Sequence, residues 1–87
     1  MKKHTKIYMQ YFDYVLDDFI PCEVCKCRAV DIHHLERRGM GGSNSKDYID
    51  NLVALCRICH DICEQSPVFN NKVKKIHKAN VKYNKIH

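Results

Sequence analysis

The sequence predicts a small α+β domain that is stabilised by a metal ion. With 87 residues the chain has room for one domain, and a core of this size usually needs a metal, disulfides or a partner as reinforcement. Apolar residues recur at helical spacing near the N-terminus, and two short apolar runs further along have the character of strands. A C-x2-C pair of cysteines stands before the first run, and a second pair follows the second run.

The first expected element is an amphipathic helix over residues 3–19. Pro21 ends it, because the residue before a proline is driven out of the helical region. The apolar stripe of this helix has the spacing i, i+3, i+4, i+7 and i+11, and consists of Tyr8, Tyr11, Phe12, Val15 and Phe19.

A compact central unit should follow this helix. Residues 22–25 form a short turn, and residues 28–35 read as a strand with apolar Ala29, Val30 and Ile32. The glycine-rich stretch at residues 38–46 predicts a loop, and residues 51–56 predict a second short strand.

Two helices are expected to complete the domain. Residues 57–65 suit a short helix, and Ser66 and Pro67 suit the N-cap and first position of a last helix over residues 67–80. The segment from residue 66 to 87 holds six lysines and no acid, namely Lys72, Lys74, Lys75, Lys78, Lys82 and Lys85. Because the whole chain carries a net charge of +5, the rest is nearly neutral. A basic segment of this kind indicates a polyanionic partner or a solvated helix.

The six cysteines indicate metal binding rather than disulfides. Residues 1–19 carry charges throughout, so we expect neither a signal peptide nor a membrane span, and we place the chain in a reducing cytoplasm. Two C-x2-C turns can present four thiolates to one tetrahedral zinc ion, and we expect this ion to be held by Cys22, Cys25, Cys56 and Cys59. Cys27 and Cys63 are expected to lie outside the site, although by spacing either could replace one of the four ligands. The alternative is a set of reduced, buried thiols.

A second group of residues suggests a further metal site. His33 and His34 are adjacent, so on a strand they point to opposite faces and take different tasks. Asn51 follows, and His60 stands directly after the last cysteine of the second pair. The zinc site should therefore draw the helix of His60 against the strand of His33.

These residues resemble the HNH endonucleases across residues 20–65. The resemblance consists of the cysteine pairs, the DIHHL segment, the glycines at 39, 41 and 42, the NLVALC segment and the final CH, all in the same order. It implies a zinc-braced ββα-metal (His-Me finger) core in a single HNH nuclease domain spanning residues 1–87. The core would be flanked by an N-terminal helix at 1–19 and a basic C-terminal helix or tail at 66–87. The small size and the RRGMGGS segment are similar to nucleases encoded by phages.

The resemblance also implies a role for each matching residue. His34 matches the general base that takes a proton from the attacking water, and His33 and His60 match ligands of a catalytic divalent cation such as Mg²⁺ or Mn²⁺. Asn51 matches the asparagine that braces the loop and helps to orient the base. Many relatives carry a histidine where this chain has Glu64, which is therefore either a third ligand or a solvated helix residue.

Other charged residues leave alternatives open. Asp31 shares a strand face with His33 and is either a partner of a ligand histidine or a plain polar residue. Arg37 and Arg38 suit phosphate binding, although exposed loop charge explains them equally well. We expect Lys72, Lys74, Lys75 and Lys78 to contact DNA phosphates.

The expected function is nicking or cutting of DNA with little sequence specificity, in a bacterial or phage-infected cell. A double-strand break would need a homodimer or two encounters, and a larger complex of phage or host proteins is also open. The alternatives are a zinc-ribbon adaptor without catalysis, and an inactive nuclease fold that binds protein, such as an inhibitor of a host defence system.

Overall fold

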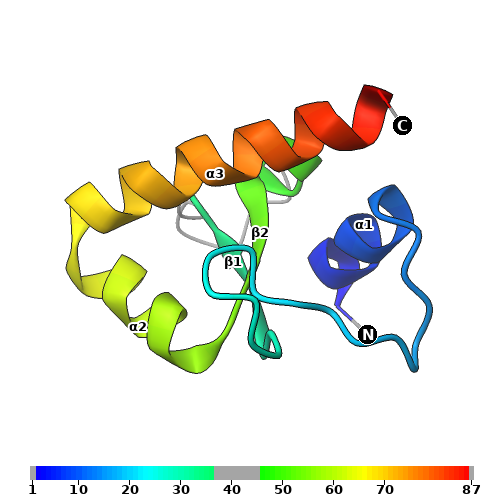
Figure 1. Cartoon of the computed structure of the whole chain (residues 1–87), viewed down its shortest axis with the longest axis horizontal. Helices are drawn as coiled ribbons and strands as arrows, with labels where there is room; N and C mark the ends of the chain where they lie inside the picture. Colours follow the sequence, from blue (N-terminus) through cyan, green and yellow to red (C-terminus); the bar gives the residue numbers. More distant parts are fainter. Residues whose placement is uncertain (1, 37–45, 87) are drawn as a thin grey trace.

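The protein is built around a two-stranded antiparallel sheet with a helix on each side and a third helix across one end (Figure 1). In the computed structural model, which describes residues 2–36 and 46–86, strand β1 (Asp31–His34) pairs with β2 (Leu52–Leu55). The helices are α1 (Lys3–Tyr11), α2 (Arg57–Gln65) and α3 (Pro67–Ile86), and a 3-10 turn, η2 (Ile49–Asn51), leads into β2. The predicted small α+β architecture is confirmed. Among the described residues, none of the helices has both the length and the apolar character needed to cross a membrane.

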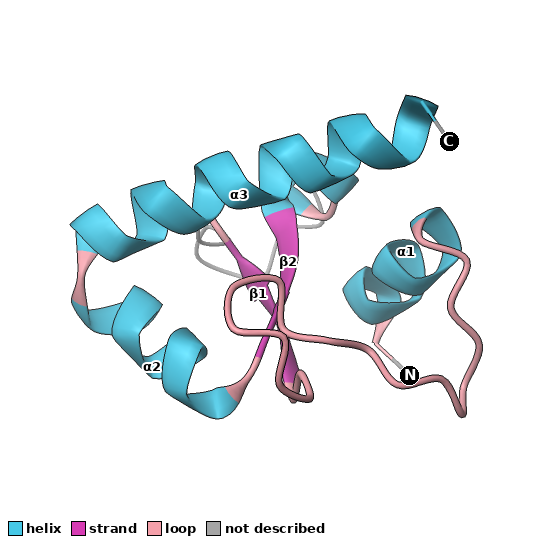
Figure 2. Ribbon diagram, in the orientation of Figure 1, coloured by secondary structure: helices cyan, strands magenta, loops and turns pink. Residues whose placement is uncertain are grey.

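Strand β2 is buried on both faces, which divides the core into two parts. Val53 and Leu55 pack with the cysteines and with Val73 of α3. Leu52 and Ala54 point the other way and pack with Tyr8 of α1. The sheet therefore lies between α1 on one side and α2 on the other, as Figure 2 shows.

The register of the sheet sets the direction of each β1 side chain. His33 lies opposite Val53 and so shares the face that α2 and α3 cover, whereas His34 lies opposite Leu52 and faces α1. The expected separation of the two histidines onto opposite faces is confirmed. Asp31 pairs with Leu55 and therefore joins His33 on the α2 face.

Helix α1 ends at Tyr11, so the predicted extension to residue 19 is wrong. Asp13 takes a left-handed backbone conformation with φ of 61°, which aspartate tolerates better than most residues. The N–H of Tyr14 then donates to the carbonyl of Met9 at 2.8 Å, as in a Schellman ending. Beyond it, the Asp18 carboxylate accepts the N–H of Val15 at 2.8 Å, a local bond that competes with helix formation.

Helix α3 extends beyond the predicted end at Asn80 to Ile86. Val73, His77 and Val81 are buried at one-turn spacing and fix the helix against the rest of the domain. In the last turns, the Asn84 amide donates to the carbonyl of Tyr11 at 3.1 Å. Contacts with α1 therefore stabilise the last turns, where the sequence predicts a frayed end.

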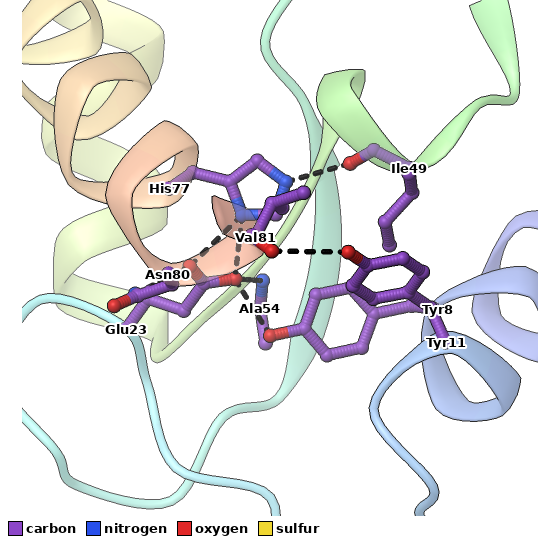
Figure 3. A network of polar contacts seen from close by, with 8 residues as sticks. All are labelled: Tyr8, Tyr11, Glu23, Ile49, Ala54, His77, Asn80 and Val81. Atoms are coloured by element: carbon purple, nitrogen blue, oxygen red, sulfur yellow. Dashed lines mark hydrogen bonds and ion pairs between the residues drawn. The ribbon is translucent and has the colours of Figure 1, made fainter. Parts of the chain in front are cut away.

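A buried polar network connects the first cysteine turn to α1, β2 and α3 (Figure 3). At its centre the Glu23 carboxylate accepts hydrogen bonds from Tyr8 at 2.6 Å, from His77 at 2.9 Å and from Asn80 at 2.8 Å. The other ring nitrogen of His77 lies 2.6 Å from the carbonyl oxygen of Ile49. Burial lowers the pKa of His77, but the hydrogen bond and charge of Glu23 outweigh it and raise the pKa overall. Neither His77 nor Glu23 lies in a motif that predicts such a central position, because the two are 54 residues apart.

Candidate metal centres and active site

The four cysteines predicted to bind zinc form one cluster. The four sulfur atoms all lie within 4.8 Å of one another, and those of Cys25 and Cys56 are 3.5 Å apart. The cluster consists of Cys22, Cys25, Cys56 and Cys59. Sulfurs at the corners of a zinc tetrahedron are about 3.8 Å apart, given Zn–S bonds of about 2.3 Å. The cluster therefore has the spacing and the ligand type that zinc requires.

The chemistry of the thiols also favours a cation in this cluster. Burial raises the pKa of Cys22, but N–H groups of Cys25, Cys56 and Val24 outweigh it and lower the pKa to about 7. For Cys59, burial and then the neighbouring sulfurs raise the pKa. Four thiolates at this distance repel one another, so only a bound cation allows all of them to be deprotonated together.

The two remaining cysteines lie outside the cluster, as predicted. Cys63 is buried in the apolar core beside Val73, and burial raises the pKa of its thiol to about 11. Cys27 is exposed, and its carbonyl accepts the N–H of Cys22 across the turn. Neither thiol is poised to ligate the same ion.

A second cluster joins His33 of β1 to His60 and Glu64 of α2. One ligand atom from each lies within 4.8 Å of the others, and the two imidazole centroids are 5.0 Å apart. A Glu64 oxygen lies 3.3 Å from Nε2 of His60 and 3.8 Å from Nδ1 of His33. Glu64 follows His60 by one helical turn, so its carboxylate reaches the space between the two rings.

The outer nitrogen of each ring in this cluster has an acceptor. Nε2 of His33 lies 3.0 Å from Oδ1 of Asn70, whose own amide N–H donates to the carbonyl of Leu35. Nδ1 of His60 lies 3.3 Å from a carboxylate oxygen of Asp31. These partners fix the tautomers in which Nδ1 of His33 and Nε2 of His60 carry lone pairs towards Glu64, an arrangement typical of histidines that bind metal.

The surroundings of His33 also favour the uncharged ring. Burial is the largest effect on its pKa, which it lowers, and the nearby rings of His60 and His34 act in the same direction. A histidine must be neutral to ligate a cation. The sequence does not predict the role of Asn70, because it is 37 residues from His33 and no motif connects them.

His34 lies on the other face of the sheet, in a different environment. Its Nε2 is 2.7 Å from the carboxylate of Asp47, whose side chain is fully buried, and its ring packs edge-on against His4 at 4.8 Å. A surface cavity of about 530 Å³ is lined by both His34 and His60. His34 also borders the α2 side, because it lines a second cavity together with His33 and Glu64.

Asn51 connects the two chain segments that flank residues 37–45. Its amide N–H groups donate to the carbonyls of Glu36 at 3.1 Å and Lys46 at 2.9 Å, and its oxygen accepts the N–H of Glu36 at 2.7 Å. This is the position that a loop-bracing asparagine requires. The predicted phosphate ligands Arg37 and Arg38 and the loop glycines lie outside the described residues.

The four predicted DNA-binding lysines are exposed along α3, but not on one face. Lys74 and Lys78 follow Asn70 at one-turn spacing and so share the side of α3 that reaches His33. Lys72 and Lys75 lie on a different side of the helix. Comparison with protein-family models, with curated proteins and with solved structures finds no match for this chain.

Proposed function

We propose that this protein is a metal-dependent endonuclease of the HNH type that hydrolyses phosphodiester bonds in DNA. The observation that carries the proposal is the convergence of His33, His60 and Glu64 on one point, beside the cavity that His34 shares with His60. Two imidazoles and a carboxylate suit Mn²⁺ or a similar divalent ion. When bound there, the ion would polarise the scissile phosphate and stabilise the charge on the leaving oxygen.

His34 is the proposed general base. Asp47 accepts a hydrogen bond from Nε2–H, which places the ring proton on Nε2 and leaves Nδ1 as the proton acceptor. The Nδ1 atom can then take a proton from the attacking water. Asp47 acts as a positioning residue, because it holds the tautomer and orientation of the ring without touching the substrate.

The exposed lysines of α3 are the proposed contacts to the DNA backbone. Lysine binds phosphate as a point charge and reads no base edges, so binding should be sensitive to salt and nearly independent of sequence. Lys74 and Lys78 are placed best for a duplex whose scissile phosphate lies near His33. The zinc-bound cysteine cluster would support this arrangement by fixing α2 against β1.

A plasmid-nicking assay tests the proposal. Wild type with one zinc ion at its cysteines should nick supercoiled DNA with Mn²⁺ or Mg²⁺, and His34→Ala should be about 10²–10⁴-fold slower, the range that general base catalysis contributes. The control is that His34→Ala retains the zinc ion of the cysteine cluster and melts at the same temperature. Unchanged nicking by His34→Ala would contradict the mechanism. A folded, zinc-loaded wild type without nicking activity would favour a zinc-binding adaptor or an inhibitor.

A further inference from the structure

A third group of potential metal ligands lies on the α1 face of the sheet. His4 of α1, His34 of β1 and Asp47, which precedes η2, each place one ligand atom within 4.8 Å of the others. We infer that these three residues form a separate transition-metal site whose occupation switches off the proposed general base. The binding site stands on its own geometry, whereas the inhibitory role rests on the proposed function.

The donor set favours zinc or a similar first-row ion. Two imidazoles and one carboxylate leave one tetrahedral position for water, as in sites where zinc has three protein ligands. The side chains are already assembled, since His34 and Asp47 are 2.7 Å apart and the His4 and His34 rings are 4.8 Å apart.

Binding at this site would change the tautomer of His34. In the metal-free state the ring proton is on Nε2, where Asp47 accepts it, and Nδ1 has the free lone pair. An ion that takes Nε2 displaces this proton, and the neutral ring then carries its proton on Nδ1. No lone pair remains to accept a proton from water, so zinc at this site inhibits hydrolysis without touching His33 or His60.

The site shares His34 with the proposed catalytic centre, but none of its ligands belongs to the proposed catalytic metal site. His34 and His4 lie on the α1 face of the sheet, whereas His33 and His60 meet on the α2 face. His4 contributes only to the α1-face cluster. Its replacement therefore separates inhibition from catalysis.

The binding test measures zinc equivalents against a chromophoric zinc indicator. In a His60→Ala background, which disables the α2-face cluster, we expect two bound zinc ions, one at the cysteines and one at the new site. When His4→Gln is combined with His60→Ala, only the zinc ion at the cysteines should remain bound. Loss of a side chain that only hydrogen-bonds to a ligand weakens metal binding by about 10–100-fold. Loss of a ligand itself should therefore weaken zinc binding by at least about 100-fold. Lys3→Gln, a neighbouring exposed position on α1, is the matched control and should retain both ions.

The inhibition test uses Mg²⁺-driven nicking. Measured against its own zinc-free rate, His4→Gln should require at least about tenfold more zinc for half-inhibition than the wild type, given the expected loss of affinity. Equal zinc counts with and without His4→Gln would overturn the site, and equal sensitivity to zinc would overturn the inhibitory role. If the wild type does not nick DNA but zinc binding still depends on His4, the result supports the metal site and overturns the proposed function. If His4→Gln does not fold, Asp47→Asn replaces it in the binding test.

Discussion

The two faces of strand β1 carry histidines in contrasting environments. On the α2 face, His33 and His60 have their outer nitrogens held by Asn70 and Asp31, and their inner nitrogens meet at Glu64. On the α1 face, His34 has a buried carboxylate on one nitrogen. The first arrangement suits two ligands of a shared cation and the second suits a proton acceptor. His33 and His34 thus differ in environment because successive side chains of a strand point to opposite faces of the sheet.

The cysteine cluster packs with Val53 and Leu55 on the α2 face, and it should have the largest effect on stability. Structural zinc sites contribute about 10–16 kcal/mol of apparent binding free energy, whereas whole domains are stable by only about 5–15 kcal/mol. We therefore expect Cys59→Ser, or removal of zinc by a chelator with a thiol-reactive mercurial, to unfold the domain. Circular dichroism with thermal melting measures this effect.

The matched control for the cysteine cluster is Cys27→Ser. Cys27 is exposed and outside the cluster, so its replacement should leave the melting temperature unchanged. A melting curve of the wild type that does not move after zinc removal would show that the cluster does not stabilise the fold.

The Glu23 network should have the next largest effect, because it joins α1 to α3 across the end of the sheet. Glu23→Ala would leave His77 and Tyr8 buried without their shared acceptor. Loss of one partner of a buried ion pair costs about 3–5 kcal/mol. Urea unfolding of the zinc-loaded protein measures the loss, and Glu36→Ala, which removes an exposed ion pair with Lys46, should cost less than about 1 kcal/mol. Similar losses for the two variants would be evidence against a central role for Glu23.

Paired variants on the two faces should separate metal binding from proton transfer. Glu64→Gln on the α2 face removes a proposed ligand, so it should weaken Mn²⁺ binding by at least about 100-fold and leave kcat at saturating Mn²⁺ less affected. Asp47→Asn on the α1 face should lower kcat and leave the affinity for Mn²⁺ unchanged. Nicking rates over a range of Mn²⁺ concentrations measure both quantities. If the two variants have the same effect, the division of labour between the faces is wrong.

The lysines of α3 should produce the smallest effect. Lys74→Ala with Lys78→Ala removes two charges on the side of α3 that carries Asn70, and Lys72→Ala with Lys75→Ala removes two elsewhere. The first pair should reduce the slope of log affinity against log salt by about 1.8, given about 0.9 for each phosphate contact. The second pair serves as the control and should change the slope less. Fluorescence anisotropy with labelled duplex DNA measures these slopes, and equal changes would assign the whole helix to DNA binding.

Local spacing in the sequence predicted much of the fold and part of the site. The C-x2-C pairs identified the cysteine cluster, because two residues between cysteines allow both to reach one ion. The period of the strand placed His33 and His34 on opposite faces, and the order of the segments brought His60 to His33. The ring distance between His33 and His60 agrees with the expected convergence.

The remaining features depend on contacts between distant segments. Asn70 and Asp47 orient the histidines from 37 and 13 residues away, and neither lies in a recognisable motif. The early end of α1 depends on the backbone of Asp13, where an apolar stripe had suggested a longer helix. The sequence does not decide whether Glu64 is a ligand or a solvated residue, and only the packing of α2 against β1 shows where its carboxylate lies.

The most direct test of the central claim is pulsed electron paramagnetic resonance of one equivalent of Mn²⁺ bound to zinc-loaded protein. His4→Gln serves as the background, because it removes the competing α1-face site. We predict nitrogen couplings from two histidines, which persist in His34→Ala and fall to one in His33→Ala. Loss of a coupling in His34→Ala, or bound Mn²⁺ without histidine nitrogen, would contradict the assignment of ligands and base to opposite faces of β1.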